Sequence, residues 1–204
     1  MTGKYKNIIF DLGGVLAGLD GQRCIEAFNS LGCEKVSYYV EKHLTADLFY
    51  DIEIGNITTA DFCEEVRRMT GCHATDEQIV WAWNELLIAI PERKLRRLLD
   101  LRNKYRLFLL SNTNDMHWSL CVEKLFRYQE WGVTDYFEQT FVSYEMHLAK
   151  PHEKIYAEVL RQADIKPEET LFIDDSKVNL EGAHALGIHG FWNEHLDDWL
   201  GVIK

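Results

Sequence analysis

Acidic side chains follow two apolar runs of this sequence, and their type and position suit two kinds of chemistry. Asp11 comes directly after the run 8–10, and Asp174 and Asp175 come directly after the run 170–173. A carboxylate can act as a nucleophile that forms a covalent intermediate, and grouped carboxylates are hard oxygen ligands that suit Mg²⁺. A plainer interpretation stays open for Asp11, because Asp is also a preferred N-cap residue of helices.

Two further polar positions could join these carboxylates. Ser111 follows the predicted strand 106–110, and Lys150 comes shortly before a predicted helix. The Ser111 hydroxyl and the backbone N–H groups of the first turn of the next helix suit phosphate oxygens. Each position also has a plainer interpretation: Ser111 could cap a helix, Lys150 could be a solvated surface residue, and residues 174–176 could be only an N-cap.

Strands and helices alternate from Pro91 onward, and this alternation predicts the fold class. The predicted strands are 8–10, 106–110, 140–143, 170–173 and 188–192. The predicted helices between them are 92–104, 115–128, 153–163 and 176–186. Such alternation predicts an α/β, Rossmann-like parallel sheet with helices on both faces. Because parallel strands end at one edge, we expect Asp11, Ser111 and Asp175 to meet there.

Residues 18–90 interrupt this alternation with helical signals alone. The expected helices cover about 22–31, 36–50, 59–70 and 75–90, with turn residues such as Gly71 between them. Four helices without a strand cannot belong to a strand–helix repeat, so we expect a small helical cap inserted after the first strand. The predicted domains are an α/β core, residues 1–17 and 91–204, and the cap, residues 18–90.

The composition excludes some classes of function. The chain has 204 residues, 47% of them hydrophobic, and a formal net charge of −11, which argues against binding nucleic acid or anionic membranes. An anionic substrate would then need a local attraction such as a metal ion. The five cysteines form no C-x-x-C pair, and no signal segment or membrane-spanning run is present. We therefore expect a reduced, cytoplasmic protein.

Four stretches of the chain resemble the four motifs of the haloacid dehalogenase superfamily. They are IIFDLGGVL (8–16), LLSNTN (109–114), AKPHEKIY (149–156) and FIDDSKVNLEGA (172–183). Their order and the helical insertion after the first motif also resemble that superfamily. The second and fourth stretches are similar to the subgroup that contains bacterial α-D-glucose-1-phosphate phosphatase and the N-terminal phosphatase domain of epoxide hydrolase.

The resemblance implies a role for each matching residue. It implies that Asp11 is the nucleophile and a metal ligand, and that Lys150 holds the nucleophile and the transferring oxygens. It implies that the phosphoryl group and the leaving group are bound by Ser111, Asn112, Asn114 and His117. It implies that Mg²⁺ is bound by Asp11, Asp175, Asp174 and the carbonyl of Gly13, with Asn179 near the ion. For His117, a role on the helix surface or in the core stays open.

One position departs from the superfamily's pattern. Its phosphatases usually have a second Asp, two residues after the nucleophile, that protonates the leaving oxygen and later activates water. This chain has Gly13 there, and such catalysis is typically worth about 10²–10⁴ in rate. The subgroup resembled here often has a glycine at this position. The leaving group could need little protonation, or a cap residue, Asp20 or Glu53, could supply the acid. Alternatively, the protein binds phosphate compounds without turnover.

We therefore expect Mg²⁺-dependent hydrolysis of a small phosphate monoester, with a sugar phosphate favoured, through an aspartyl-phosphate intermediate. One alternative is a binding protein for phosphorylated metabolites that lacks turnover, which Gly13 favours. A second alternative is a metal-free 2-haloacid dehalogenase, which the pair Asp174 and Asp175 disfavours. The expected partner is a small phosphorylated metabolite, with no nucleic acid or membrane, and the chain is expected to be a monomer or a homodimer.

Overall fold

A five-stranded parallel sheet forms the core of the computed structural model, which describes residues 5–41 and 47–203. The sheet has the order β3-β2-β1-β4-β5. Its strands are β1 (Asn7–Phe10), β2 (Arg106–Ser111), β3 (Gln139–Val142), β4 (Thr170–Asp174) and β5 (His189–Trp192). The prediction of a parallel, Rossmann-like sheet is confirmed, and the observed strands lie within about one residue of the predicted ones.

The central strand β1 positions the rest of the sheet. All four of its residues are buried, as expected for a strand covered on both faces. It pairs with β2 through Phe10 opposite Leu109, and with β4 through Phe10 opposite Ile173. The chain builds outward from β1 through β2 and β3, and then returns to the other side of β1 with β4. Ligands of open α/β sheets bind where the strand order reverses in this way, which is at the carboxyl ends of β1 and β4.

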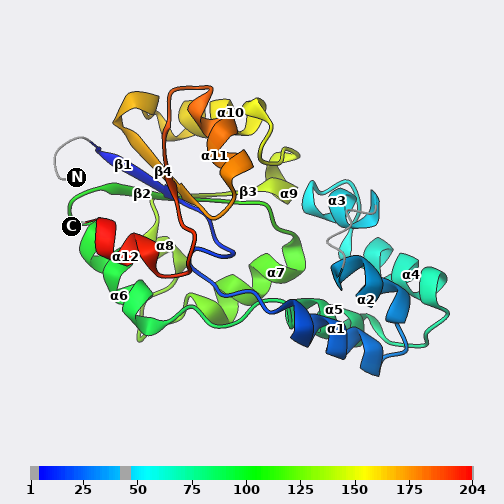
Figure 1. The fold of residues 1–204 in the computed structure, drawn as a ribbon. Coiled ribbons are helices and arrows are strands. Elements are labelled where there is room, and N and C mark those ends of the chain that lie inside the picture. The colour runs from blue at the N-terminus through cyan, green and yellow to red at the C-terminus, as the bar shows by residue number, and fades with distance from the viewer. Residues whose placement is uncertain (1–4, 42–46, 204) are drawn as a thin grey trace.

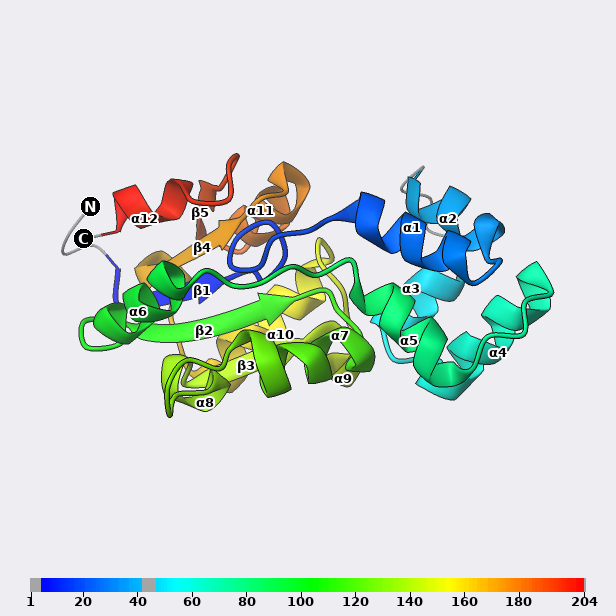
Figure 2. The same ribbon diagram turned by 90° about the horizontal axis from the view of Figure 1, so that it is seen from below.

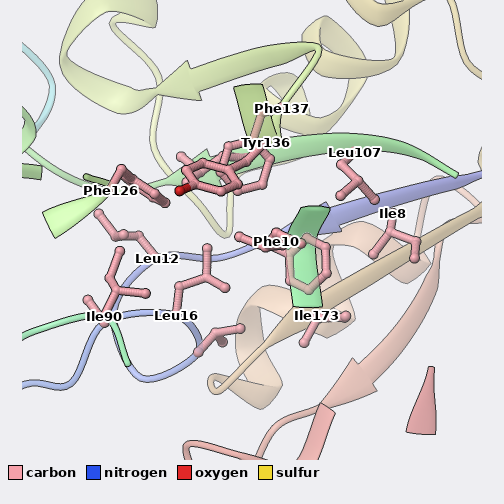
Figure 3. Close-up of a cluster of buried hydrophobic side chains, with 14 of the residues drawn as sticks. Ile8, Phe10, Leu12, Leu16, Ile90, Leu107, Phe126, Tyr136, Phe137 and Ile173 are labelled. Carbon is pink, nitrogen blue, oxygen red and sulfur yellow. The ribbon is translucent and has the colours of Figure 1, made fainter. Parts of the chain in front are cut away.

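Helices cover both faces of the sheet (Figure 1). One face packs against α10 (Glu153–Ala163) and α11 (Lys177–His184), and its buried cluster includes Ile9 and Phe108. The opposite face packs against α6 (Glu92–Leu101), and its cluster is built around Phe10. Figure 3 shows the ring of Phe10 among these side chains. Alternate residues of β1 therefore supply the two halves of the core.

The remaining elements of the core are short. They are α7 (Asp115–Leu120), the π-helical turn Cys121–Leu125, α8 (Val133–Tyr136), α9 (Ser143–Met146), the 3₁₀ turn Pro167–Glu169 and α12 (Asp198–Val202). The predicted helix 115–128 is thus an α-helix followed by a π-helical turn. In the part of the chain that the structure describes, no helix is long and apolar enough to cross a membrane.

A second group of helices lies beyond the end of the sheet toward which β2 points (Figure 2). It consists of α1 (Gly21–Ser30), α2 (Glu34–Glu41), α3 (Asp47–Glu53), α4 (Thr59–Thr70) and α5 (Asp76–Asn84). These helices enclose an apolar cluster of their own, which includes Phe28, Phe62 and Trp83. We call this group the cap, and its boundaries at residues 18 and 90 stay a prediction.

The cap has more helices than the sequence indicated. The segment expected to be helical over 36–50 corresponds to two described helices, α2 up to Glu41 and α3 from Asp47, and residues 42–46 of it lie outside the described part. α3 also extends past the expected end to Glu53. The predicted turn follows it, with Gly55 at a φ of +69°, a conformation that glycine adopts without steric cost.

Two adjacent chain segments join the cap to the core. The backbone N–H of Asp20 donates to the carbonyl of Leu86 over 2.8 Å, and that of Ile88 donates to the carbonyl of Gly18 over 3.0 Å. The segment that enters the cap is therefore hydrogen-bonded to the segment that leaves it. This short ladder fixes where the cap begins relative to β1.

The loop that follows β1 is held by a buried lysine. The Lys94 ammonium donates to the carbonyls of Val15, of Leu16 (3.3 Å) and of Leu196 (2.6 Å), and its side chain is fully buried. One side chain of α6 thus satisfies three carbonyl groups from two loops. A buried carbonyl left without a donor costs about 1–3 kcal/mol, so this lysine stabilises the loop beside the sheet edge.

We predict that Lys94→Met lowers the free energy of unfolding by about 1–3 kcal/mol, because it leaves these carbonyls without a charged donor. Urea unfolding followed by circular dichroism measures the change. Lys104→Met is the control, since Lys104 is exposed and surface changes usually stay within about 0.5 kcal/mol. Equal stability of the two variants would contradict this account of Lys94.

Candidate active site

The carboxyl ends of β1, β2 and β4 open into a cavity of about 230 Å³ between the sheet and the cap. The core contributes mainly polar residues to it, and the full set is Asp11, Leu12, Gly13, Ser111, Asn112, Thr113, His117, Lys150, Asp175 and Asn179. The cap side contributes Leu19, Glu53, Trp83, Leu86 and Leu87. The structure therefore brings together the strand ends that the sequence analysis expected to meet.

Lys150 lies at the centre of this arrangement. Its buried ammonium is 2.8 Å from Oδ1 of Asp11 and 2.7 Å from Oδ2 of Asp174, and it donates to the carbonyl of Leu110 over 3.2 Å. Burial lowers the pKa of Lys150, but the two carboxylates outweigh burial and raise it above its ordinary value. Lys150 is therefore a permanent positive charge between two strand ends.

Asp11 is held from one side and open on the other. Its Oδ1 accepts from the backbone N–H of Leu12 over 2.7 Å and faces Lys150. Among the described residues, none donates a hydrogen bond to Oδ2. Burial raises the pKa of Asp11, and the Lys150 ammonium opposes this shift. The arrangement fixes the carboxylate and leaves one oxygen available to react.

Three carboxylates form a candidate cation site. Asp11, Asp174 and Asp175 each offer an oxygen, and these oxygens lie within 4.8 Å of one another. Both oxygens of Asp174 already accept hydrogen bonds, from Ser176 and Asn179 on Oδ1 and from Lys150 on Oδ2. No side chain in the described ranges donates to the carboxylate of Asp175. The geometry thus favours Asp11 and Asp175 as direct ligands, with Asp174 and Asn179 supporting them.

The backbone leaves room for Asp175 beside the loop after β1. Gly14 has a φ of +69°, and a Cβ built there would lie 2.1 Å from Oδ2 of Asp175. Burial and the neighbouring Asp174 raise the pKa of Asp175. Hard oxygen ligands around an excess of negative charge are what Mg²⁺ requires. The residues present therefore fit a divalent cation.

The residues expected to bind phosphate occupy different positions. Ser111 lines the cavity from the end of β2. Asn112 also lines it, but its side chain bridges the main chain of Lys150: its Nδ2 donates to the carbonyl over 2.9 Å, and its Oδ1 accepts from the N–H over 2.8 Å. The amide of Asn112 therefore positions Lys150, and the Ser111 hydroxyl donates to the carbonyl of Asn112 over 3.3 Å at the cavity wall.

The first turn of α7 corrects one expectation. Its backbone N–H groups were expected to bind phosphate, but that of His117 donates to Asn114 and that of Met116 donates to Asp115. Asn114 itself is fully buried, caps α7 and is absent from the cavity wall. Helix capping satisfies these groups locally, so they are not available to a ligand.

His117 joins the core to the cap. Its Nε2 is 3.0 Å from the carbonyl of Trp83 and its Nδ1 is 3.3 Å from Nδ2 of Asn114, so Nε2 carries the proton and Nδ1 accepts. The ring also stacks on the indole of Trp83, with centroids 5.0 Å apart and planes at 17°. Burial lowers the pKa of His117 to about 4. It is therefore a neutral contact at the cavity wall with both nitrogens engaged.

The two candidates for the missing acid have different positions. Asp20 caps α1 by accepting from the backbone N–H of Arg23, and it is not part of the cavity wall. Glu53 lies at the end of α3 and lines the same cavity as Gly13 and Asp11. The structure thus separates two residues that the sequence could only name together.

Sequence reasoning missed Ser143, which lies directly after β3. Its buried hydroxyl accepts from the N–H of Thr113 over 2.9 Å and donates to the carbonyls of Glu53 (2.6 Å) or Thr113 (3.0 Å). It therefore connects the cap to two strand ends. The rule that singled out Ser111, a polar residue at the end of a predicted strand, would also have found Ser143.

Comparisons with known proteins agree with this geometry. D-ribitol-5-phosphate phosphatase from Bacteroides thetaiotaomicron is 30% identical over 194 residues, which cover 95% of this chain and 94% of that protein. A HAD-family enzyme of the same organism, crystallised with magnesium and inorganic phosphate, superimposes with a TM-score of 0.93 at 44% identity and covers 98% of this chain and 100% of that one.

A further crystal structure, of a protein from Porphyromonas gingivalis described as a predicted HAD-like family hydrolase, gives a TM-score of 0.89 at 34% identity. It covers 98% of this chain and 96% of that one. A family model described as haloacid dehalogenase-like hydrolase matches residues 5–187. The resemblance of the four motifs is thereby confirmed, and the chain belongs to the haloacid dehalogenase-like hydrolase family.

Proposed function

We propose that this chain is a Mg²⁺-dependent phosphatase that hydrolyses a small phosphate monoester through an aspartyl-phosphate on Asp11. The observation that carries the proposal is the buried ammonium of Lys150 between Asp11 and Asp174, at a cavity that Asp175 also lines. Two relatives support it: one is named a phosphatase, and the other was crystallised with magnesium and inorganic phosphate.

The reaction has two displacements at phosphorus. Oδ2 of Asp11 attacks the phosphorus atom, and the bond from phosphorus to the substrate's alkoxide oxygen breaks. Water then attacks the same phosphorus and breaks its bond to Asp11, which returns as a carboxylate. Lys150 stabilises the charge that develops on the transferring oxygens, and the Ser111 hydroxyl turns from the carbonyl of Asn112 to donate a hydrogen bond to one of them.

A bound Mg²⁺ would offset the negative charge of the carboxylates and of the substrate phosphate. Asp11 and Asp175 would hold it, because each offers a carboxylate oxygen and these oxygens lie within 4.8 Å of each other. The repulsion among these acidic groups would otherwise oppose the approach of a phosphate dianion. The chain's own net charge of −11 makes this local attraction necessary.

A phosphorylated sugar or sugar alcohol is the favoured substrate. The cavity of about 230 Å³ is small, which restricts the substrate to a compact molecule. The relative that is 30% identical is named for D-ribitol 5-phosphate, a phosphorylated polyol. On the cap side, Leu19, Trp83 and Leu87 form an apolar wall that can select the leaving group by shape.

Two alternative functions can be distinguished from this phosphatase by experiment. Gly13 leaves no carboxyl group at its own position in the cavity wall, which favours a protein that binds phosphorylated metabolites without turnover. Such a protein would be thermally stabilised by sugar phosphates and would release no phosphate in a panel of them. A metal-free dehalogenase would release halide in the presence of EDTA, but the carboxylate cluster of Asp174 and Asp175 favours a cation site.

We predict that Asp11→Asn reduces the turnover of 4-nitrophenyl phosphate below about 0.1% of the parent rate, because removing a nucleophile abolishes the covalent route. Nitrophenolate absorbance measures the rate. The control is Asp100→Asn, an exposed carboxylate on α6, which should keep the parent rate. Turnover in Asp11→Asn close to that of the parent would exclude Asp11 as the nucleophile.

Removal of divalent cations tests the role of the carboxylates. We predict that EDTA abolishes phosphate release and that added Mg²⁺ restores it. Mg²⁺ should also stabilise the parent. At a Mg²⁺ concentration of 100 times its dissociation constant, the free energy of unfolding should rise by about 2–3 kcal/mol, and the thermal unfolding midpoint should rise with it. Asp175→Asn should weaken this stabilisation, whereas Asp100→Asn should retain it. Phosphate release that is insensitive to EDTA would contradict the cation site.

A further inference from the structure

We propose that Glu53, contributed by the cap, carries the proton in both displacements: it protonates the leaving oxygen and then takes a proton from the attacking water. This inference rests on the proposed function, because it assumes that Asp11 is the nucleophile. An alkoxide is a poor leaving group, so cleavage of an alkyl phosphate gains about 10²–10⁴ in rate from a positioned acid. Gly13 has no side chain to supply one.

The other ionisable groups of the described cavity wall already have different tasks. Asp11 attacks phosphorus and Asp175 faces the cation site. Lys150 is held charged between two carboxylates. The remaining ionisable group on the core side, His117, uses one nitrogen toward Trp83 and the other toward Asn114. None of these groups is free to give a proton and take it back.

Glu53 is in a different situation. Of the described cavity-lining residues that the cap contributes, it alone has an ionisable side chain, because the others are Leu19, Trp83, Leu86 and Leu87. Its carboxyl group makes no hydrogen bond or ion pair with any residue in the described ranges. It also lies at the C-terminal end of α3, where the partial negative charge of the helix disfavours a carboxylate.

The electrostatics of the cavity agree with this role. Burial raises the pKa of Glu53 to about 7, although the Lys150 ammonium lowers it. Asp11 and Asp175 line the same cavity, so a charged Glu53 would add to an excess of negative charge. A carboxyl group that titrates near neutral pH can act first as an acid and then as a base.

The backbone around Glu53 is fixed to the core by three contacts. Its carbonyl accepts from the Ser143 hydroxyl over 2.6 Å, and the carbonyl of Ile54 accepts from Nδ1 of His147 over 2.9 Å. The third is a close approach, because a Cβ on Gly55 would lie 2.1 Å from the carbonyl oxygen of Tyr144. The end of α3 is therefore docked on the segment after β3, which holds Glu53 at the cavity.

Glu53 gives a proton in the first displacement and regains one in the second. In the first, the carboxylic acid gives its proton to the leaving alkoxide oxygen as Asp11 bonds to phosphorus, and it becomes a carboxylate. In the second, this carboxylate takes a proton from water as the water oxygen bonds to phosphorus and the bond to Asp11 breaks. The products are an alcohol and inorganic phosphate, and Glu53 ends protonated as it began.

The experiment compares two leaving groups in Glu53→Gln, which keeps the shape of the side chain. One substrate is the primary alkyl phosphate that the parent hydrolyses fastest in a panel of sugar and polyol phosphates. The other is 4-nitrophenyl phosphate, whose leaving group needs no proton. The matched control is Glu64→Gln, since Glu64 is an exposed cap carboxylate on α4 and should behave as the parent does.

We expect Glu53→Gln to lower kcat for the alkyl phosphate by about 10²–10⁴. With 4-nitrophenyl phosphate, rapid mixing should show a burst of about one nitrophenolate per enzyme molecule followed by slow turnover, because only the second displacement then needs the proton carrier. An unchanged stabilisation by Mg²⁺ in a thermal scan would show that the variant is folded with its cation site intact.

Other outcomes would overturn the inference. A raised KM with an unchanged kcat would make Glu53 a substrate-binding residue only. An equal loss of activity on both substrates, without a burst, would mean that Glu53 does not act at the leaving oxygen. If the parent itself released no phosphate from any substrate, the proposed function would fail, which is a distinct result from the failure of Glu53.

Discussion

The buried ammonium of Lys150 is the interaction on which the rest of the site depends. It lies within 2.8 Å of Asp11 and 2.7 Å of Asp174, and so joins the carboxyl ends of two neighbouring strands. Buried carboxylates without a partner are strongly destabilising, and breaking such a pair costs about 3–5 kcal/mol. The strand order β3-β2-β1-β4-β5 brings these ends together, and Asn112 fixes the main chain of Lys150 from β2's side.

The positive charge of Lys150 does not balance the negative charges of the acidic groups around it. Asp11, Asp175 and Glu53 line the cavity, and Asp174 lies beside it, whereas Lys150 is the permanent cation of the described wall. Such an excess of negative charge can be relieved in two ways, by a bound divalent cation or by a proton on one of the carboxyl groups. The excess of negative charge thus accounts for a site suited to Mg²⁺, and burial, which raises the pKa of Glu53, favours a proton on that carboxyl group.

The sequence could predict the fold and the strand-end residues because both follow from local patterns. Apolar runs mark buried strands, and parallel strands bring Asp11, Ser111 and Asp175 to one edge. It could not predict how Asn112 and Asn114 use their amides, because the partner of an amide is set by tertiary packing. For the same reason the sequence could not decide whether Asp20 or Glu53 lines the cavity, because this depends on how α3 docks onto Ser143 and the turn after it.

Because Glu53 belongs to the cap, the proposed proton transfer needs both the cap and the core. Asp11, Lys150 and Asp175 all lie at the sheet edge, and the contacts that join them involve no residue of the cap. A proton carrier at Gly13 would share that independence. A proton carrier on α3 does not, because its position depends on contacts between Ser143, His147 and the end of α3. Proton transfer by Glu53 therefore requires a docked cap. In the docked position the apolar wall of the cap also excludes water from the leaving oxygen.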